Sequence, residues 1–84
     1  MNASYPRTPY PKTCLLIANM GINASRVLLE DLSTAGYYEV LVDGNGRKKF
    51  DPVTKQVRRV RREWPSLADG IRVIDQYIKE GGAS

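Results

Sequence analysis

The sequence contains no histidine and a single cysteine, Cys14. One cysteine cannot form an internal disulfide, which excludes the cross-linked framework of small secreted proteins. Without histidine, zinc sites of the common cysteine and histidine types cannot form within one chain. Nucleophile systems that use histidine as the general base are excluded for the same reason. We therefore expect no catalytic residue, no metal site and no cofactor, and we predict that the protein is not an enzyme.

Long apolar runs are also missing. The longest run extends from Cys14 to Ala18, which is far too short to cross a bilayer. The first thirteen residues contain no apolar core of signal-peptide length. We therefore expect a cytoplasmic protein that does not bind membranes.

The chain has 84 residues, which is enough for one domain. A domain of this size buries only about 60% of the surface that its unfolded chain exposes, so its core is thin. Formation of a homodimer would bury more apolar surface and is therefore expected. Hydrophobic residues make up 42% and charged residues 26% of the chain, a composition that argues against a wholly disordered protein.

Positive charge is concentrated between Arg47 and Arg62. This stretch holds eight basic residues and one acidic residue, a net charge of +7. The rest of the chain carries five basic and eight acidic residues, a net charge of −3. Such a one-sided distribution is typical of proteins that bind a polyanion. We expect the basic side chains to be crowded onto one side of the folded molecule and open to solvent.

Proline and glycine divide the chain into three parts. Residues 1–12 contain Pro6, Pro9 and Pro11, and each proline removes a backbone donor and disfavours helix at the residue before it. We predict an extended Pro-rich arm over 1–12, a single small basic domain over 13–80, and a flexible tail over 81–84.

Two N-terminal helices are expected within the domain. Residues 13–20 are short and apolar and end at Gly21, which favours a helix, although a buried strand would fit as well. Residues 23–35 have apolar side chains at helical spacing, with capping residues before them and Gly36 after them, so they predict a second helix.

The middle of the chain predicts antiparallel strands. Residues 37–43 alternate in the way that a half-buried strand requires, and residues 43–46 form a strong turn signal. Residues 47–50 would be the return strand. Residues 51–64 fit either an amphipathic helix or a turn followed by a third strand, and the strand is favoured because it continues the meander.

The C-terminal helix has the clearest pattern. Ser66 is a good N-cap, apolar residues recur at helical spacing after it, and Gly81 and Gly82 end it. The predicted fold class is thus α+β: N-terminal helices, a β-hairpin or three-stranded antiparallel meander, and a C-terminal amphipathic helix.

The segment from Met20 to Val27 places a glycine at a tight turn between two expected helices, and a hairpin rich in Arg and Lys follows it. This order resembles winged helix-turn-helix regulators. The resemblance implies that Ser25 and Arg26 lie near the start of a recognition helix, with Arg47 and the two lysines after it on the wing. An ordinary helical hairpin around the glycine is the alternative.

The C-terminal half has a second architectural likeness. Three antiparallel strands within residues 37–63, with a helix packed behind them, resemble the small sheet domains of integrase arms and ethylene-response factors. Those domains lay a sheet face in the DNA major groove.

We predict a small DNA-binding regulator or accessory factor. Lysine and arginine neutralise phosphates, and arginine can also recognise guanine edges. The alternative function is a non-enzymatic interaction or inhibitor module that docks on an acidic protein surface. The candidate contacts are Ser25, Arg26, Arg47, Lys48, Lys49, Lys55, Arg58, Arg59, Arg61 and Arg62.

Overall fold

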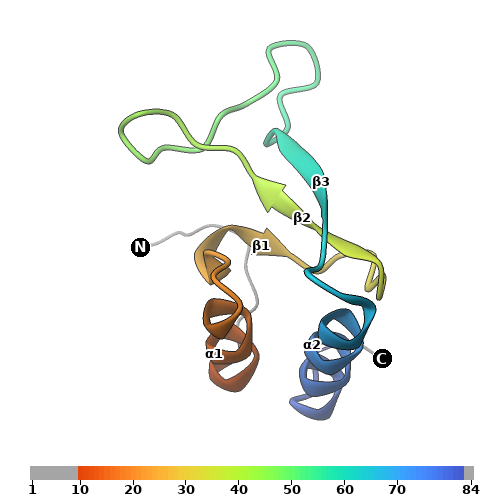
Figure 1. Cartoon of the computed structure of the whole chain (residues 1–84). Helices are drawn as coiled ribbons and strands as arrows, with labels where there is room; N and C mark the ends of the chain where they lie inside the picture. Colours follow the sequence, from red (N-terminus) through yellow and green to blue (C-terminus); the bar gives the residue numbers. More distant parts are fainter. Residues whose placement is uncertain (1–9, 83–84) are drawn as a thin grey trace.

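The computed structural model describes residues 10–82, which form two helices and a three-stranded antiparallel sheet (Figure 1). In chain order the elements are α1 (Pro11–Asn19), a short 3-10 helix η1 (Ala24–Arg26), β1 (Val27–Leu28), β2 (Gly36–Val40), β3 (Arg59–Glu63) and α2 (Leu67–Lys79). The α+β class and the C-terminal helix are confirmed. Residues 1–9 and 83–84, which include most of the expected arm and part of the expected tail, lie outside the described residues.

Helix α1 confirms the helical prediction for residues 13–20 but begins earlier. Pro11 occupies the first turn, where a helix loses nothing from a missing backbone N–H. The last two residues of the expected arm therefore belong to α1. The helix ends where expected, because Gly21 adopts a left-handed φ of 81°.

The predicted helix over residues 23–35 is wrong. The chain makes one 3-10 turn, continues as β1 and then forms a loop. In that loop, Asp31 Oδ1 accepts a hydrogen bond from the Ser33 amide at 2.9 Å, and Ser33 Oγ accepts one from the Ala35 amide at 3.1 Å. Leu32 also has a left-handed φ of 50°. These local bonds satisfy the backbone in a way that competes with helix.

Strand β2 pairs along its whole length with β3, and Tyr38 lies opposite Arg61. The strand favoured for residues 51–64 is therefore confirmed at 59–63, and the helical alternative is wrong. The turn at residues 43–46 is also present, with the Gly46 amide donating to the Asp43 carbonyl. The return strand is reduced to isolated bridges from Lys48 to Val42 and from Phe50 to Val57.

The core lies between the two helices and one face of the sheet. Its buried side chains come from every element except β3 and η1, and Trp64 extends it directly after β3. The Trp64 ring packs 4.4 Å from the Tyr37 ring, and its Nε1 donates to the Ser33 carbonyl at 3.3 Å. Helix α2 then begins at its predicted N-cap, because Ser66 Oγ accepts from the Asp69 amide.

The two helices are joined at the ends of the described chain. Glu80 accepts a 2.8 Å hydrogen bond from the hydroxyl of buried Thr13. The Tyr10 hydroxyl donates to the Gly81 carbonyl, and its ring lies edge-on to Tyr77. The first residues after α2 are thus held in place by specific contacts with the start of α1.

Gly70 permits the close approach of α2 to the loop after β1. A Cβ atom at this position would overlap the Thr34 carbonyl oxygen and the Trp64 ring. We expect Gly70→Ala to lower the free energy of unfolding by about 1–3 kcal/mol through this overlap, although alanine favours helix by about 1 kcal/mol. Urea titration measures the change. Gly44→Ala, whose Cβ would meet open space, is the control, and a Gly70→Ala protein as stable as this control would contradict the packing.

Candidate nucleic-acid interface

Residues 41–58, which we call the basic lobe, leave the sheet after β2 and return to it at β3 (Figure 1). Three backbone hydrogen bonds close the base of the lobe. The Leu41 amide donates to the Arg58 carbonyl, the Arg58 amide to the Lys49 carbonyl, and the Lys49 amide to the Leu41 carbonyl, at 2.8–3.0 Å. The lobe is therefore a separate projection on a closed base.

Two aspartates shape the turns of the lobe. Asp43 Oδ1 accepts hydrogen bonds from the Asn45 and Arg47 amides at 2.8 and 3.0 Å. Asp51 Oδ1 accepts hydrogen bonds in the same manner from the Val53 and Thr54 amides, at 2.7 and 3.0 Å. Backbone hydrogen bonds, from Arg47 and Thr54 first of all, lower the pKa of each carboxyl below its usual value. Both side chains therefore hold the backbone turns of the lobe in place.

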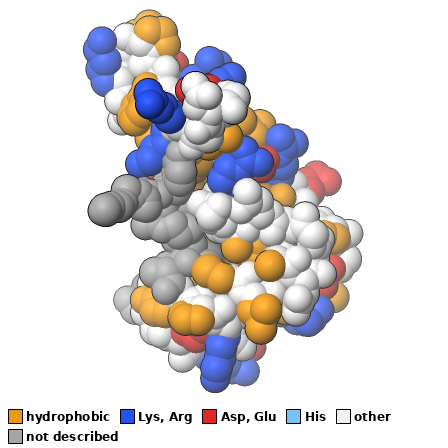
Figure 2. Space-filling view, turned by 90° about the vertical axis from the view of Figure 1, so that its left-hand side faces the viewer, with side chains coloured by type: hydrophobic (Ala, Val, Ile, Leu, Met, Phe, Trp, Pro, Cys, Tyr) orange, Lys and Arg blue, Asp and Glu red, His pale blue; other side chains and the backbone are white. Residues whose placement is uncertain are grey.

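The lobe brings together half of the predicted site residues. Its five basic and two acidic residues give a net charge of +3, and Figure 2 shows Lys and Arg side chains on the projection and around its base. Four exposed cations of the lobe make no ion pair within 4 Å of a carboxylate in residues 10–82, namely Arg47, Lys49, Lys55 and Arg58. Lys48 is half-buried beside Val42.

Two apolar side chains accompany these charges. Phe50 is 55% exposed and Val53 is 85% exposed. The surface of the lobe therefore combines unpaired cations with an accessible aromatic ring.

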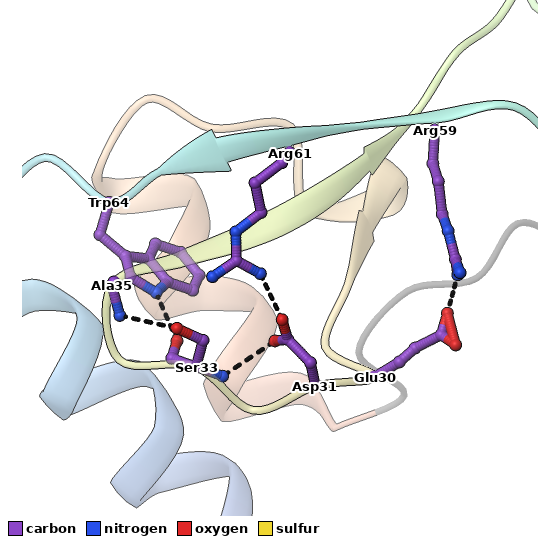
Figure 3. Close-up of polar contacts among 7 residues, drawn as sticks. All are labelled: Glu30, Asp31, Ser33, Ala35, Arg59, Arg61 and Trp64. Atoms are coloured by element: carbon purple, nitrogen blue, oxygen red, sulfur yellow. Dashed lines mark hydrogen bonds and ion pairs between the residues drawn. The ribbon is translucent and has the colours of Figure 1, made fainter.

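Arg59 and Arg61 have a different environment from the lobe. They project from the face of β3 that points away from the helices, where their guanidinium groups lie 4.8 and 5.2 Å from the centre of the Tyr38 ring. Figure 3 shows each arginine reaching across the sheet to a carboxylate in the loop after β1. Arg59 pairs with Glu30, and Arg61 pairs with Asp31.

Arg62 and Arg26 lie on the opposite face of the sheet and share one carboxylate. Glu39, whose side chain is only 16% exposed, pairs with Arg62 at 2.5 Å and with Arg26 at 3.3 Å. The Nε atom of Arg26 is buried and has no hydrogen-bond partner among residues 10–82. The expectation that all the basic side chains crowd onto one open side is therefore wrong for the strand arginines.

The predicted recognition residues do not begin a helix. Ser25 and Arg26 belong to η1, which ends at once in β1. Ser25 is exposed and donates both its amide and its hydroxyl to Asn23 Oδ1, at 3.1 and 2.6 Å. Arg26 is turned inward to Glu39. Neither residue therefore lies at the start of an α-helix.

Three carboxylates that sequence reasoning did not assign to the site control its arginines. Glu30 and Asp31 are paired with β3, although the sequence suggested that they occupied the middle of a helix. Glu39 is placed between two arginines. Side chains alternate between the two faces of a strand, so the sequence could have shown that Arg59 and Arg61 share one face and that Arg62 lies on the other. Nothing local to these residues indicated their partners.

No model of a known protein family, no curated protein and no solved structure matches the chain. The resemblance to winged helix-turn-helix regulators stays a prediction. Neither helix of residues 10–82 has the length and apolar character to span a membrane. Over the same range, no group of three or more His, Cys, Asp or Glu side chains could hold a metal ion.

The shared carboxylate of Glu39 should matter more for stability than the exposed carboxylate of Glu30. We expect Glu39→Gln to lower the free energy of unfolding by about 1–3 kcal/mol, because two arginines, one of them partly buried, lose their charged partner. Glu30→Gln removes one exposed pair and should cost no more than about 1 kcal/mol. Chemical denaturation of both variants checks this order, and equal losses would contradict it.

The turns of the lobe should depend on pH. The pKa values of Asp43 and Asp51 are lowered in the folded protein. The ionised carboxylates therefore stabilise the two turns at any pH above the ordinary aspartate pKa of about 4. This stabilisation is lost as the pH falls through the lowered values. We expect the NMR amide signals of Arg47 and Thr54 to shift only in that acidic range. Asp43→Asn should abolish the acid shift at Arg47 and preserve it at Thr54, and a shift unaffected by this substitution would count against the assignment.

Proposed function

We propose that this protein binds nucleic acid through the basic lobe and has no enzymatic activity. The observation that carries the proposal is the contrast between two sets of cations. Arg59, Arg61 and Arg62 are paired within the chain. Four exposed cations of the lobe, by contrast, make no ion pair within 4 Å of a carboxylate in residues 10–82, namely Arg47, Lys49, Lys55 and Arg58. A polyanion approaching the lobe therefore meets a net positive charge of +3.

The chemistry of the lobe suits phosphates. Lysine and arginine side chains that are exposed and unpaired release counterions when they contact a nucleic-acid backbone. Arg47 and Arg58 can in addition form two hydrogen bonds to one phosphate. The two aspartates of the lobe stay ionised and reduce its positive charge, but a net charge of +3 remains, and their side chains are bonded to backbone amides.

The outer face of the sheet is less suited to the same task. A phosphate that approached Arg59 or Arg61 would also meet the carboxylates of Glu30 and Asp31. We therefore assign the contacts to the lobe cations, with the strand arginines serving mainly to hold the sheet and its loop together.

Matched charge removal tests this proposal. The double variant Lys49→Ala, Lys55→Ala removes two exposed lobe cations, and Arg72→Ala, Lys79→Ala removes two exposed cations of α2. We expect only the lobe variant to bind DNA more weakly, with the slope of log affinity against log salt reduced by about 2. Fluorescence anisotropy with random double-stranded and single-stranded DNA and with RNA measures both quantities. Equal effects of the two variants, or no binding at low salt, would end the proposal.

An exposed apolar side chain of the lobe, Val53, favours a second candidate function. Val53 is 85% exposed and offers neither charge nor an aromatic plane to a nucleic acid. A lobe that docks on an acidic protein surface would use this side chain together with the cations. In that case Val53→Ser should weaken capture of a protein from nuclease-treated lysate, and nucleic-acid affinity should be absent.

A further inference from the structure

Strand β3 forms one edge of the sheet, because the strand order is β1-β2-β3. In Figure 1 no described segment runs along its far side. The opposite edge is formed by β1, which is only two residues long. The described part of the chain therefore has a single long open edge, and an unpaired edge of this kind invites pairing with another strand.

The hydrogen bonds show which backbone groups of β3 are open. The Leu41 amide donates to the Arg58 carbonyl, and the Trp64 amide donates to the Ala35 carbonyl. These bonds fix the alternation of the antiparallel ladder, in which every second residue bonds to β2. The amide and carbonyl groups of residues 60 and 62 therefore face β2, and those of 59, 61 and 63 face outward.

We propose that β3 pairs with β3 of a second copy of this chain, in antiparallel orientation about a two-fold axis at Arg61. This register sets all the outward groups of residues 59, 61 and 63 against one another. It places Arg59 opposite Glu63 of the other copy, twice, and opposite charges in directly facing positions stabilise a sheet. Arg59 also pairs with Glu30 of its own chain, whereas Glu63 makes no ion pair within residues 10–82, so the second copy supplies the missing partner of Glu63. The two three-stranded sheets join into one sheet of six strands.

The charges of the edge permit this self-association. Two Arg61 side chains would face each other at the axis, and they would repel each other if neither were neutralised by a carboxylate. Each Arg61 is already held by its own Asp31, and each Arg62 by its own Glu39. Because Asp31 and Glu39 already pair with Arg61 and Arg62, a strongly acidic foreign strand would gain little from these two arginines.

A proline substitution on the edge tests the backbone pairing. Arg61→Pro removes an outward amide that bonds to no backbone acceptor in residues 10–82, so we expect the isolated fold to tolerate it. Arg61→Ala removes the same side chain and keeps the amide. We expect sedimentation equilibrium to show a dimer for the unchanged protein and for Arg61→Ala, and at least tenfold weaker association for Arg61→Pro, with circular dichroism confirming that each variant is folded. A protein that is monomeric up to about 1 mM, or equal association of the two variants, would overturn the proposal.

A charge reversal tests the register, and it does not depend on the proline variant folding. Glu63→Arg puts an arginine opposite Arg59 of the other copy and should weaken the dimer at least tenfold at low salt. Asp75→Arg makes the same change of charge on exposed α2 and should leave association unchanged. An unaltered dimer in Glu63→Arg would overturn the register. Neither measurement involves nucleic acid, so these outcomes are independent of the function of the lobe.

Discussion

The pairing of β2 with β3 is the contact on which the rest of the molecule depends. It joins residues on either side of the basic lobe, and its register puts Tyr38 opposite Arg61. One face of the pair supplies Tyr37 to the core beside Trp64. The other face carries the arginines that hold the loop after β1. Because the pair also closes the base of the lobe, a shift of register by one residue would exchange the two faces and disrupt all of these contacts together.

Much of this fold could be predicted from local patterns. Ser66 and the helical spacing after it identify α2, and residues 43–46 tolerate the positive φ values that a tight turn requires. The error at residues 23–35 has a physical cause, because apolar spacing there imitated a helix while Asp31 and Ser33 bonded to nearby amides instead. Side chains that bond to their own backbone neighbours can override a periodic pattern in so short a segment.

The candidate site was only half predictable. Counting charges between residues 47 and 62 located the lobe, because exposed turns keep their charges where the sequence places them. The same count failed for the strand, where Arg59, Arg61 and Arg62 meet carboxylates that are more than twenty residues away in the chain. A net charge summed over a segment says nothing about partners brought in by the tertiary fold. The electrostatic character of this protein therefore arises in two ways, from local density in the lobe and from long-range neutralisation on the sheet.

The closed base of the lobe has a consequence for how the chain could change over time. A backbone hydrogen bond joins Leu41 to Arg58, so the residues between them form a loop whose two ends are already adjacent. Lengthening, shortening or exchanging that loop costs little in loop-closure entropy and does not alter the buried side chains, none of which belongs to residues 41–58. The scaffold can thus present different peptide segments at the same position while the framework beneath is preserved.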